Sequence, residues 1–397
     1  MKKSRITLTV LSLIIAHSVF SADYTSVIRQ IAENNSEIKV IEAKASGDVS
    51  SLLPANNLPD PEIDYEQVFG KAGQKWGLSV SQSVEWPGVY SSRSRAIAAE
   101  AEALSFASTS RKLEILSEIK QTIIKIVYAK KKITLVTRQL ELIDELSAKY
   151  KKSYEMGNST ILDINKLKIE RLGYEHRLDD CRLELASLSA DLKALNGDKN
   201  VDKIVEAISG YPSDTILPES EYYRLVAEYD PDSRVNALLS KTEDFRIDQL
   251  SKESLPNFRI GYKHTFELGD HFNGFSIGIT LPFFSNRYKK AAAISRKEAY
   301  DVAANYAIEK SSAEIRKTMK EATDLKRQLE KYSPIINDSR NASTLRKALD
   351  GGQISLLTFI QELNYFVDAE GESLEIEYEY ASTLAKLNRY SLLSNGL

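Results

Sequence analysis

The stretch LPDPEIDY at positions 58–65 returns, with half of its letters unchanged, as LPNFRIGY at positions 255–262. Each copy introduces two short segments that alternate like strands, followed by a long segment with apolar residues at helical spacing. Each long segment then reaches a glycine-led corner, MGNSTILD at 156–163 and GGQISLLT at 351–358. A period of about half the chain indicates a duplicated unit of strand, strand, long helix and helix, rather than a solenoid of short repeats.

Two predicted hairpins carry side chains of opposite character on their two faces. We expect strands at about 61–69 and 76–86 in the first copy and at about 257–267 and 274–283 in the second. The apolar face holds Tyr65, Trp76, Val80, Trp86, Phe258, Tyr262, Phe275 and Ile279, with Gln82 as an exception. The polar face holds Glu62, Asp64, Glu66, Ser79, Ser81, Arg259, Lys263 and Thr280.

The helical segments are far longer than those of ordinary globular proteins. No glycine or proline occurs from Val89 to Met156, and a helix over most of that span is about 100 Å long. The apolar spacing predicts helical hairpins at about 89–196 and 287–394, preceded in the second copy by a helix at about 232–254. The expected organisation is a leader at 1–21, a first repeat at 22–196, a linker at 197–225 and a second repeat at 226–397.

Composition narrows the class of protein. The basic residues Lys2, Lys3 and Arg5 and the apolar run 6–16 predict a secretory leader with cleavage after Ser21. The chain has 53 basic and 56 acidic residues, well mixed, which argues against nucleic acid as a partner. Its single cysteine, Cys181, excludes an internal disulfide, and its histidines show no i, i+4 pairing that suggests a metal site. No catalytic residue set and no cofactor motif is recognised, so we expect no enzyme activity and no cofactor.

The two-faced strands suggest a membrane pore. The same alternation fits a sheet packed on a protein core, but isolated hairpins are only marginally stable in water, and the apolar faces here are rich in aromatic residues. A sheet in lipid has to close on itself, and four strands are too few for a barrel with a lumen. We therefore expect several copies of the chain to share one barrel, with the apolar face on lipid and the polar face on the lumen.

At this point the chain resembles the outer-membrane efflux family, the TolC-type exit ducts of Gram-negative bacteria. The resemblance implies a mainly α-helical chain with a small membrane β-part, assembled as a homotrimer with one twelve-stranded barrel and a helical tunnel across the periplasm. It also implies a location in the cell outer membrane and contacts with outer-membrane lipid. The implied partners are a periplasmic adaptor and an inner-membrane transporter, with the RND type favoured.

The implied function is a passive exit duct of a tripartite pump for small solutes, including metal cations or drugs. The run QSVEWPG at 82–88 is similar to the hairpin exit of the heavy-metal, CzcC-like branch. A protein secretion duct of type I with the same fold stays open as an alternative. A soluble periplasmic adaptor with helical hairpins is the other alternative.

The two glycine-led corners are the candidate periplasmic tip and gate. The first is similar to the family's tip motif, a glycine followed six residues later by aspartate; the second has threonine in place of the aspartate and a glutamate four residues further on. The candidate residues are Gly157, Thr160, Asp163, Gly352, Ser355, Thr358 and Glu362. A ring of such carboxylates would favour cations, whereas capping of a helix N-terminus is the alternative role for Asp163.

Overall fold

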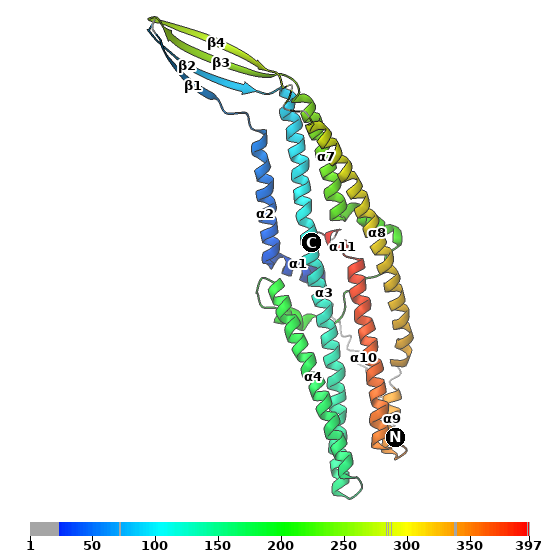
Figure 1. Cartoon of the computed structure of the whole chain (residues 1–397). Coiled ribbons are helices and arrows are strands. Elements are labelled where there is room, and N and C mark those ends of the chain that lie inside the picture. Colours follow the sequence, from blue (N-terminus) through cyan, green and yellow to red (C-terminus); the bar gives the residue numbers. More distant parts are fainter. Residues whose placement is uncertain are drawn as a thin grey trace, which may run out of the picture.

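The computed structural model describes residues 24–70, 73–282, 284, 286, 288–336, 340–394 and 396, so the predicted leader lies outside the described residues. The molecule is an elongated bundle of helices with one small sheet at its end (Figure 1). The helices of the first half are α1 (Tyr24–Asn34), α2 (Ser36–Leu52), the 3-10 turn η1 (Leu53–Asn56), α3 (Pro87–Glu155), α4 (Ile161–Leu195) and α5 (Asp202–Ala207). Those of the second half are α6 (Glu219–Tyr229), α7 (Pro231–Lys252), α8 (Lys289–Ile336), α9 (Arg340–Asp350), α10 (Leu356–Leu387) and α11 (Ser391–Ser394).

The helix α3 sets the length of the molecule. It has 69 residues, which at 1.5 Å per residue is about 100 Å. Pro87 starts it at a position where a missing N–H is harmless, and Gly157, with φ of 79°, ends it. There the Asn158 N–H donates to the carbonyl of Ser153 at 2.8 Å, which is the six-to-one bond of a Schellman turn. The sheet and the corner between α3 and α4 therefore lie at opposite ends of the molecule (Figure 1).

The other helices pack along α3 in columns. The helices α2 and α4 follow each other along one side of α3, while α7 and α10 follow each other between α3 and α8 (Figure 1). One buried cluster surrounds the middle of α3 and includes Ile31, Leu116 and Tyr222. A second cluster joins α3, α4 and α10 towards the far corners and includes Leu167 and Phe359. Neither cluster includes a residue of the sheet.

The four strands form one antiparallel sheet in the order β1 (Glu62–Gly70), β2 (Gly73–Val84), β3 (Asn257–Glu267) and β4 (Asp270–Thr280). The two hairpins are joined through β2 and β3, in which Val80 pairs with Tyr262. Strands β1 and β4 are the two edges, and neither pairs on its outer side within the described chain. The sheet is therefore open at both sides.

Some predicted boundaries are wrong. Strand β2 begins at Gly73, not at position 76, and β4 spans 270–280, not 274–283. The second turn contains only Leu268 and Gly269, whose φ values of 53° and 93° are those of a type I′ hairpin. Asn273 and Gly274 resemble turn residues in sequence, yet they lie within β4 because the ladder continues to Asp270. The predicted linker at 197–225 contains α5 and the start of α6, whose buried Tyr222 and Leu225 pack into the first cluster.

Candidate functional site

The register places the predicted polar residues on one face of the sheet. Glu62 pairs with Ser81, Asp64 with Ser79, and Ser79 in turn with Lys263. This polar face carries Glu62, Asp64, Glu66, Lys75, Ser79, Ser81, Arg259, Lys263, Glu267, Asp270 and Thr280, together with several glycines. Lys263 forms an ion pair with Glu66 at 3.2 Å, and Lys75 forms one with Glu267 at 2.9 Å. Carboxylates outnumber cations, so the face has negative charge in excess.

The middle of the polar face accepts only small residues. A Cβ atom on Gly261 would lie 2.8 Å from Ser276 Oγ and 3.0 Å from the Cβ of Ser81. A Cβ atom on Gly77 would likewise lie 3.3 Å from Cε of Lys263. Small residues at the middle of this face and charged residues beside them suit a wet passage better than a packed core.

Most large side chains of the opposite, apolar face are exposed in the single chain. Phe275 is 87% exposed and Ile277 is 77% exposed, values that are normal for lysine and rare for large apolar side chains. The register puts Tyr65, Trp76, Val80, Phe258, Tyr262, Phe275 and Ile279 on this face. Trp86 lies just beyond β2, with its ring centroid 6.1 Å from that of Phe258. An apolar surface that extends over all four strands in this way is typical of contact with lipid or with another protein.

A polar cluster fixes the point where the strands join the helices. Arg93 on α3 bridges Glu85 at 2.8 Å and Glu253 at 3.1 Å, and its side chain is only 15% exposed. Next to it, Ser92 Oγ donates to Asp248 Oδ2 at 2.7 Å, and the ammonium of Lys252 lies 2.8 Å from the same oxygen. The exit of the first hairpin and the end of α7, which leads into the second hairpin, are thereby held to α3, so the sheet is fixed at the end of the bundle.

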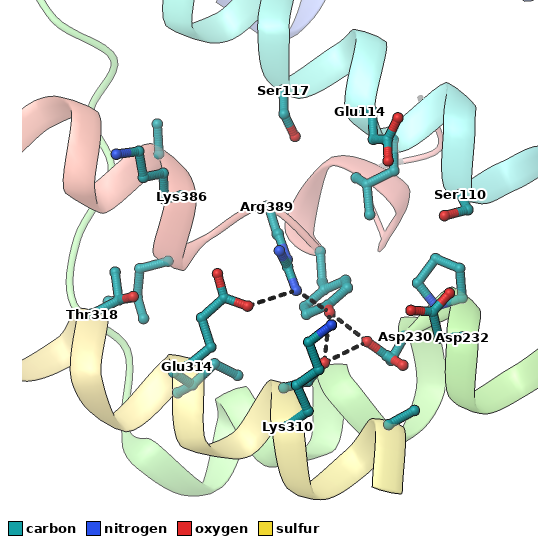
Figure 2. A pocket seen from close by; sticks show the side chains of 18 of the residues that line it. Ser110, Glu114, Ser117, Asp230, Asp232, Lys310, Glu314, Thr318, Lys386 and Arg389 are labelled. Carbon is teal, nitrogen blue, oxygen red and sulfur yellow. Dashed lines mark hydrogen bonds and ion pairs between the residues drawn. The ribbon is translucent and has the colours of Figure 1, made fainter. Parts of the chain in front are cut away.

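A cavity of about 450 Å³ lies at mid-length, where α7 begins and α10 ends. Figure 2 shows Ser110, Glu114 and Ser117 of α3 facing Lys310 and Thr318 of α8 across it. The gap arises because the column of α7 and α10 is made of two helices rather than one. The cavity thus lies at the gap between the start of α7 and the end of α10.

Buried hydrogen bonds connect the helices around this cavity. Asp230, which is 3% exposed, caps α7 by accepting from Ser233 N at 2.9 Å. Its other oxygen accepts from the hydroxyls of Ser311 at 2.7 Å and Tyr390 at 2.6 Å. Burial raises the pKa of Tyr390 to about 12, so this hydroxyl stays protonated and able to donate. Arg389 donates to Tyr390 Oη at 2.6 Å, which ties the segment after α10 to α7 and α8.

The first corner is a complete capping box. Thr160 Oγ1 accepts from Asp163 N at 3.2 Å, and Asp163 Oδ2 accepts from Thr160 N at 3.1 Å and from the Thr160 hydroxyl at 2.7 Å. The hydroxyl bond is the main cause that holds the pKa of Asp163 below its ordinary value. Asp163 therefore caps the helix, as one of the two sequence interpretations expects, and stays ionised above acid pH.

The second corner uses hydroxyls for the same purpose. Ser355 Oγ accepts from Thr358 N at 3.1 Å, so Thr358 occupies the place of Asp163 without its charge. Glu362 is exposed one turn further along α10. The two corners lie at the same end of the molecule (Figure 1) and are joined by ion pairs of Lys149 with Asp350 at 2.5 Å and Arg346 with Glu145 at 2.8 Å. Both repeats of the chain thus carry a carboxylate near their corner, Asp163 in the first repeat and Glu362 in the second.

Sequence reasoning missed two polar clusters because each depends on the packing of one element against another. Glu243 of α7 is 1% exposed and is bound by Arg246 at 2.7 Å and by Arg296 of α8 at 2.9 Å. His264 and His271, which appear scattered in the sequence, lie with their ring nitrogens 3.2 Å apart across the second hairpin. Both clusters depend on pairings between elements, and no local spacing signals them.

No protein-family model and no curated protein matches the sequence. The fold, however, is that of solved outer-membrane channels. A membrane protein from Pseudomonas aeruginosa is 15% identical, with 93% of each chain covered and a TM-score of 0.72. CusC, described for its folding and transmembrane channel formation, is also 15% identical, with 94% of this chain and 92% of its own covered and a TM-score of 0.72. The open-state MtrE outer-membrane channel of Neisseria gonorrhoeae is 16% identical, with 92% and 88% covered and a TM-score of 0.69.

These likenesses define the class of architecture. The chain has the fold of channel-forming outer-membrane proteins. More particularly, it has the TolC-type fold, in which one chain supplies a four-stranded sheet and two long helical hairpins. The likeness does not distinguish the heavy-metal branch from other branches. Among the described residues, none of the helices is sufficiently long and apolar to span a membrane.

Proposed function

We propose that this chain is one subunit of a homotrimeric exit duct, set in the outer membrane of a Gram-negative bacterium and extending into the periplasm. The observation that carries the proposal is the open, two-faced sheet fixed at the end of helices about 100 Å long. The apolar face suits lipid, the polar face suits a wet lumen, and the helices have the length to continue that lumen away from the membrane.

The two free edges of the sheet supply the reason for assembly. An edge strand in lipid has unpaired backbone groups, each of which costs several kcal/mol. Pairing β4 of one copy with β1 of the next removes these edges, and three copies with four strands each make a barrel of twelve. The residues predicted to face lipid and lumen then keep those roles all round the barrel.

The helices support the same assembly. Leu162, Ile169 and Leu183 of α4 are exposed and lie in one seven-residue register, which is the spacing of a coiled-coil seam. At the other side of the chain, α8 exposes Ile294, Val302 and Tyr306. These outer columns have no partner column within the described chain, and a neighbouring copy would bury them against each other.

The duct would act without catalysis, together with a periplasmic adaptor and an inner-membrane transporter, for which we favour the RND type. The cargo class is small solutes, including metal cations or drugs, and the transporter rather than the duct would select among them. The type I protein secretion duct has the same architecture. A soluble adaptor fits poorly, because its sheet would expose Phe275 and Ile277 to water.

Oligomeric state tests the proposal. We expect the detergent-extracted protein to behave as a trimer in light scattering, to fractionate with the outer membrane and to form conducting pores in planar bilayers. The physical reason is that a single sheet has no way to satisfy both of its edges. A stable, folded monomer without conductance would overturn the proposal.

The tip carboxylates yield a second prediction. We propose that Asp163 and Glu362 narrow and charge the periplasmic end of the duct, so that the double variant Asp163→Ala with Glu362→Ala lowers cation preference and changes block by trivalent cations. Single-channel recording at asymmetric salt measures both effects. Unchanged selectivity and block would leave Asp163 with its capping role alone.

A matched variant separates charge from capping. Asn at position 163 keeps a side-chain oxygen that accepts from Thr160 N, and Gln at position 362 keeps the size of the glutamate. The variant Asp163→Asn with Glu362→Gln should therefore show the same change in selectivity as the alanine pair while keeping the helix start intact. If only the alanine pair changes conductance, the cause is a loosened corner, not lost charge.

A further inference from the structure

The free end of the second hairpin carries a paired arrangement of imidazoles. His264 of β3 and His271 of β4 lie diagonally across the strand pair, on either side of the turn that Leu268 and Gly269 form. Nε2 of His264 and Nδ1 of His271 are 3.2 Å apart, and the ring centroids are 5.2 Å apart. Both rings lie on the apolar face, in contact with Trp76 and Phe266.

Neighbouring polar groups determine which ring nitrogen of His264 carries the hydrogen. Its Nδ1 lies 2.7 Å from Asn273 Oδ1, and the Tyr262 hydroxyl donates to the same oxygen at 2.8 Å. An amide oxygen only accepts, so Nδ1 of His264 carries the hydrogen. In the neutral ring the lone pair is therefore on Nε2, the atom that faces His271. A donor bond from the second ring nitrogen to an oxygen is the arrangement that orients histidines as metal ligands.

The separation of the two nitrogens matches the bite of a transition metal. With metal–nitrogen bonds of about 2.0–2.1 Å, a tetrahedral angle gives a nitrogen–nitrogen distance of ~3.4 Å and a right angle gives ~2.9 Å. The 3.2 Å between Nε2 and Nδ1 falls between these limits. His271 needs only to carry its proton on Nε2 rather than on Nδ1, a change of tautomer that releases no proton.

We propose that His264 and His271 form a two-histidine site for a divalent cation of borderline softness, Cu²⁺, Ni²⁺ or Zn²⁺, with water completing the coordination. Imidazole is a preferred ligand of these ions. The site would link β3 to β4 beside the hairpin turn and hold the end of this hairpin together. That this end faces the external medium rests on the proposed function, whereas binding of the ion does not.

The protein contains its own reporter of binding. Trp76 lies with its ring centroid 5.4 Å from that of His264 and 6.5 Å from that of His271, and bound Cu²⁺ quenches the fluorescence of a nearby indole. The chain has two tryptophans, so Trp86→Phe leaves Trp76 as the only one. In this background, titration of the detergent-solubilised protein with CuCl₂ should give saturable quenching at one ion per chain, reversed by excess Zn²⁺.

Three variants test the assignment of the ligands. His264→Ala and His271→Gln should each raise the Cu²⁺ concentration for half-maximal quenching at least tenfold. Asn273→Leu, which removes the acceptor that orients His264, should raise it about tenfold, the lower end for an orienting partner. His176→Ala is the matched control, since this exposed histidine lies on α4, away from the sheet, and pairs with Asp180 at 3.7 Å; it should change nothing.

The readout is independent of transport. Circular dichroism and light scattering on each variant show whether the fold and the oligomer are kept, and His271, being exposed, tolerates glutamine readily. Quenching with an unchanged midpoint in the His264→Ala, His271→Gln double variant would overturn the site, as would equal loss in His176→Ala. A chain that conducts no ions yet binds Cu²⁺ through these histidines would instead contradict the proposed function and leave the site standing.

Discussion

Arginine in place of Val80 is expected to prevent most of the protein from assembling in the membrane. Val80 lies in the middle row of the apolar face, in register with Ile63, Tyr262 and Phe275. A cation at the centre of the bilayer costs about 2–4 kcal/mol, and a threefold assembly would incur that cost three times. The measurement is the yield of heat-modifiable trimer in outer-membrane fractions, compared with the wild-type chain.

The neighbouring residue is the matched control. Ser81 follows Val80 directly but points to the polar face, so Ser81→Arg should assemble normally and change the conductance instead. Ile279→Arg should have an intermediate effect, because Ile279 pairs with Phe258 in a row next to the helices, where the cost of a charge falls to about 0–1 kcal/mol. Equal tolerance of Val80→Arg and Ser81→Arg would show that the sheet does not face lipid.

The two faces were predictable because alternation is a local property. Once β2 is extended, side chains two residues apart share a face whatever the strand pairs with, so Trp76, Val80 and Ser81 can be sorted from sequence. The ends of the strands were less predictable. Asn273 and Gly274 look like a turn, yet they belong to β4, because the positive φ values of Leu268 and Gly269 complete the hairpin first.

The long helices were predictable for the same local reason, since nothing between Val89 and Met156 interrupts the apolar spacing. The pairing of elements was not. The shared barrel expected from the sequence requires the two hairpins to join, but the sequence does not reveal that they join through β2 and β3. His264 and His271 are seven residues apart, a spacing without meaning in a single strand, and only the turn between them brings the rings together.

The candidate tip illustrates both what the sequence predicts and what it does not. Capping of a helix N-terminus is one of the two roles expected for Asp163, and the structure contains a capping box of Thr160 and Asp163. Whether Asp163 also lines a constriction depends on where neighbouring copies lie, which the local motif does not encode. In the second corner the cap survives the loss of the aspartate because Ser355 and Thr358 provide hydroxyls. Capping and charge are therefore separate properties of the corner, and Glu362 supplies only the second.

The largest effect on stability is expected at Glu243, a site that the sequence does not reveal. Its carboxylate is 1% exposed and accepts from Arg246 Nη1 at 2.7 Å and from Arg296 at 3.1 Å (Nε) and 2.9 Å (Nη2). Arg246 also reaches Glu100 at 2.7 Å, so the cluster ties α7 to α8 and α3. Glu243→Gln should lower the free energy of unfolding by about 2–3 kcal/mol, since charge-assisted hydrogen bonds are lost while both guanidinium groups keep some access to water.

The pH dependence of the free energy of unfolding tests whether the ionised carboxylate of Glu243 is the cause of this stabilisation. Burial alone would raise the pKa of Glu243, but the hydrogen bonds from Arg296 and Arg246 outweigh it and hold the pKa below its ordinary value of 4.5. A lowered pKa in the folded state means that the stabilisation is complete above pH 4.5 and is lost as the pH falls through the folded-state pKa.

Chemical denaturation followed by circular dichroism should therefore show a gap in the free energy of unfolding between wild type and Glu243→Gln at pH 7, and this gap should narrow in acid. Asp244→Asn is the control, because Asp244 is 56% exposed and its ion pair with Lys297 is long at 3.6 Å. A gap of the same size at pH 7 and pH 3, or an equal loss in Asp244→Asn, would show that the buried charge of Glu243 is not what stabilises this part of the bundle.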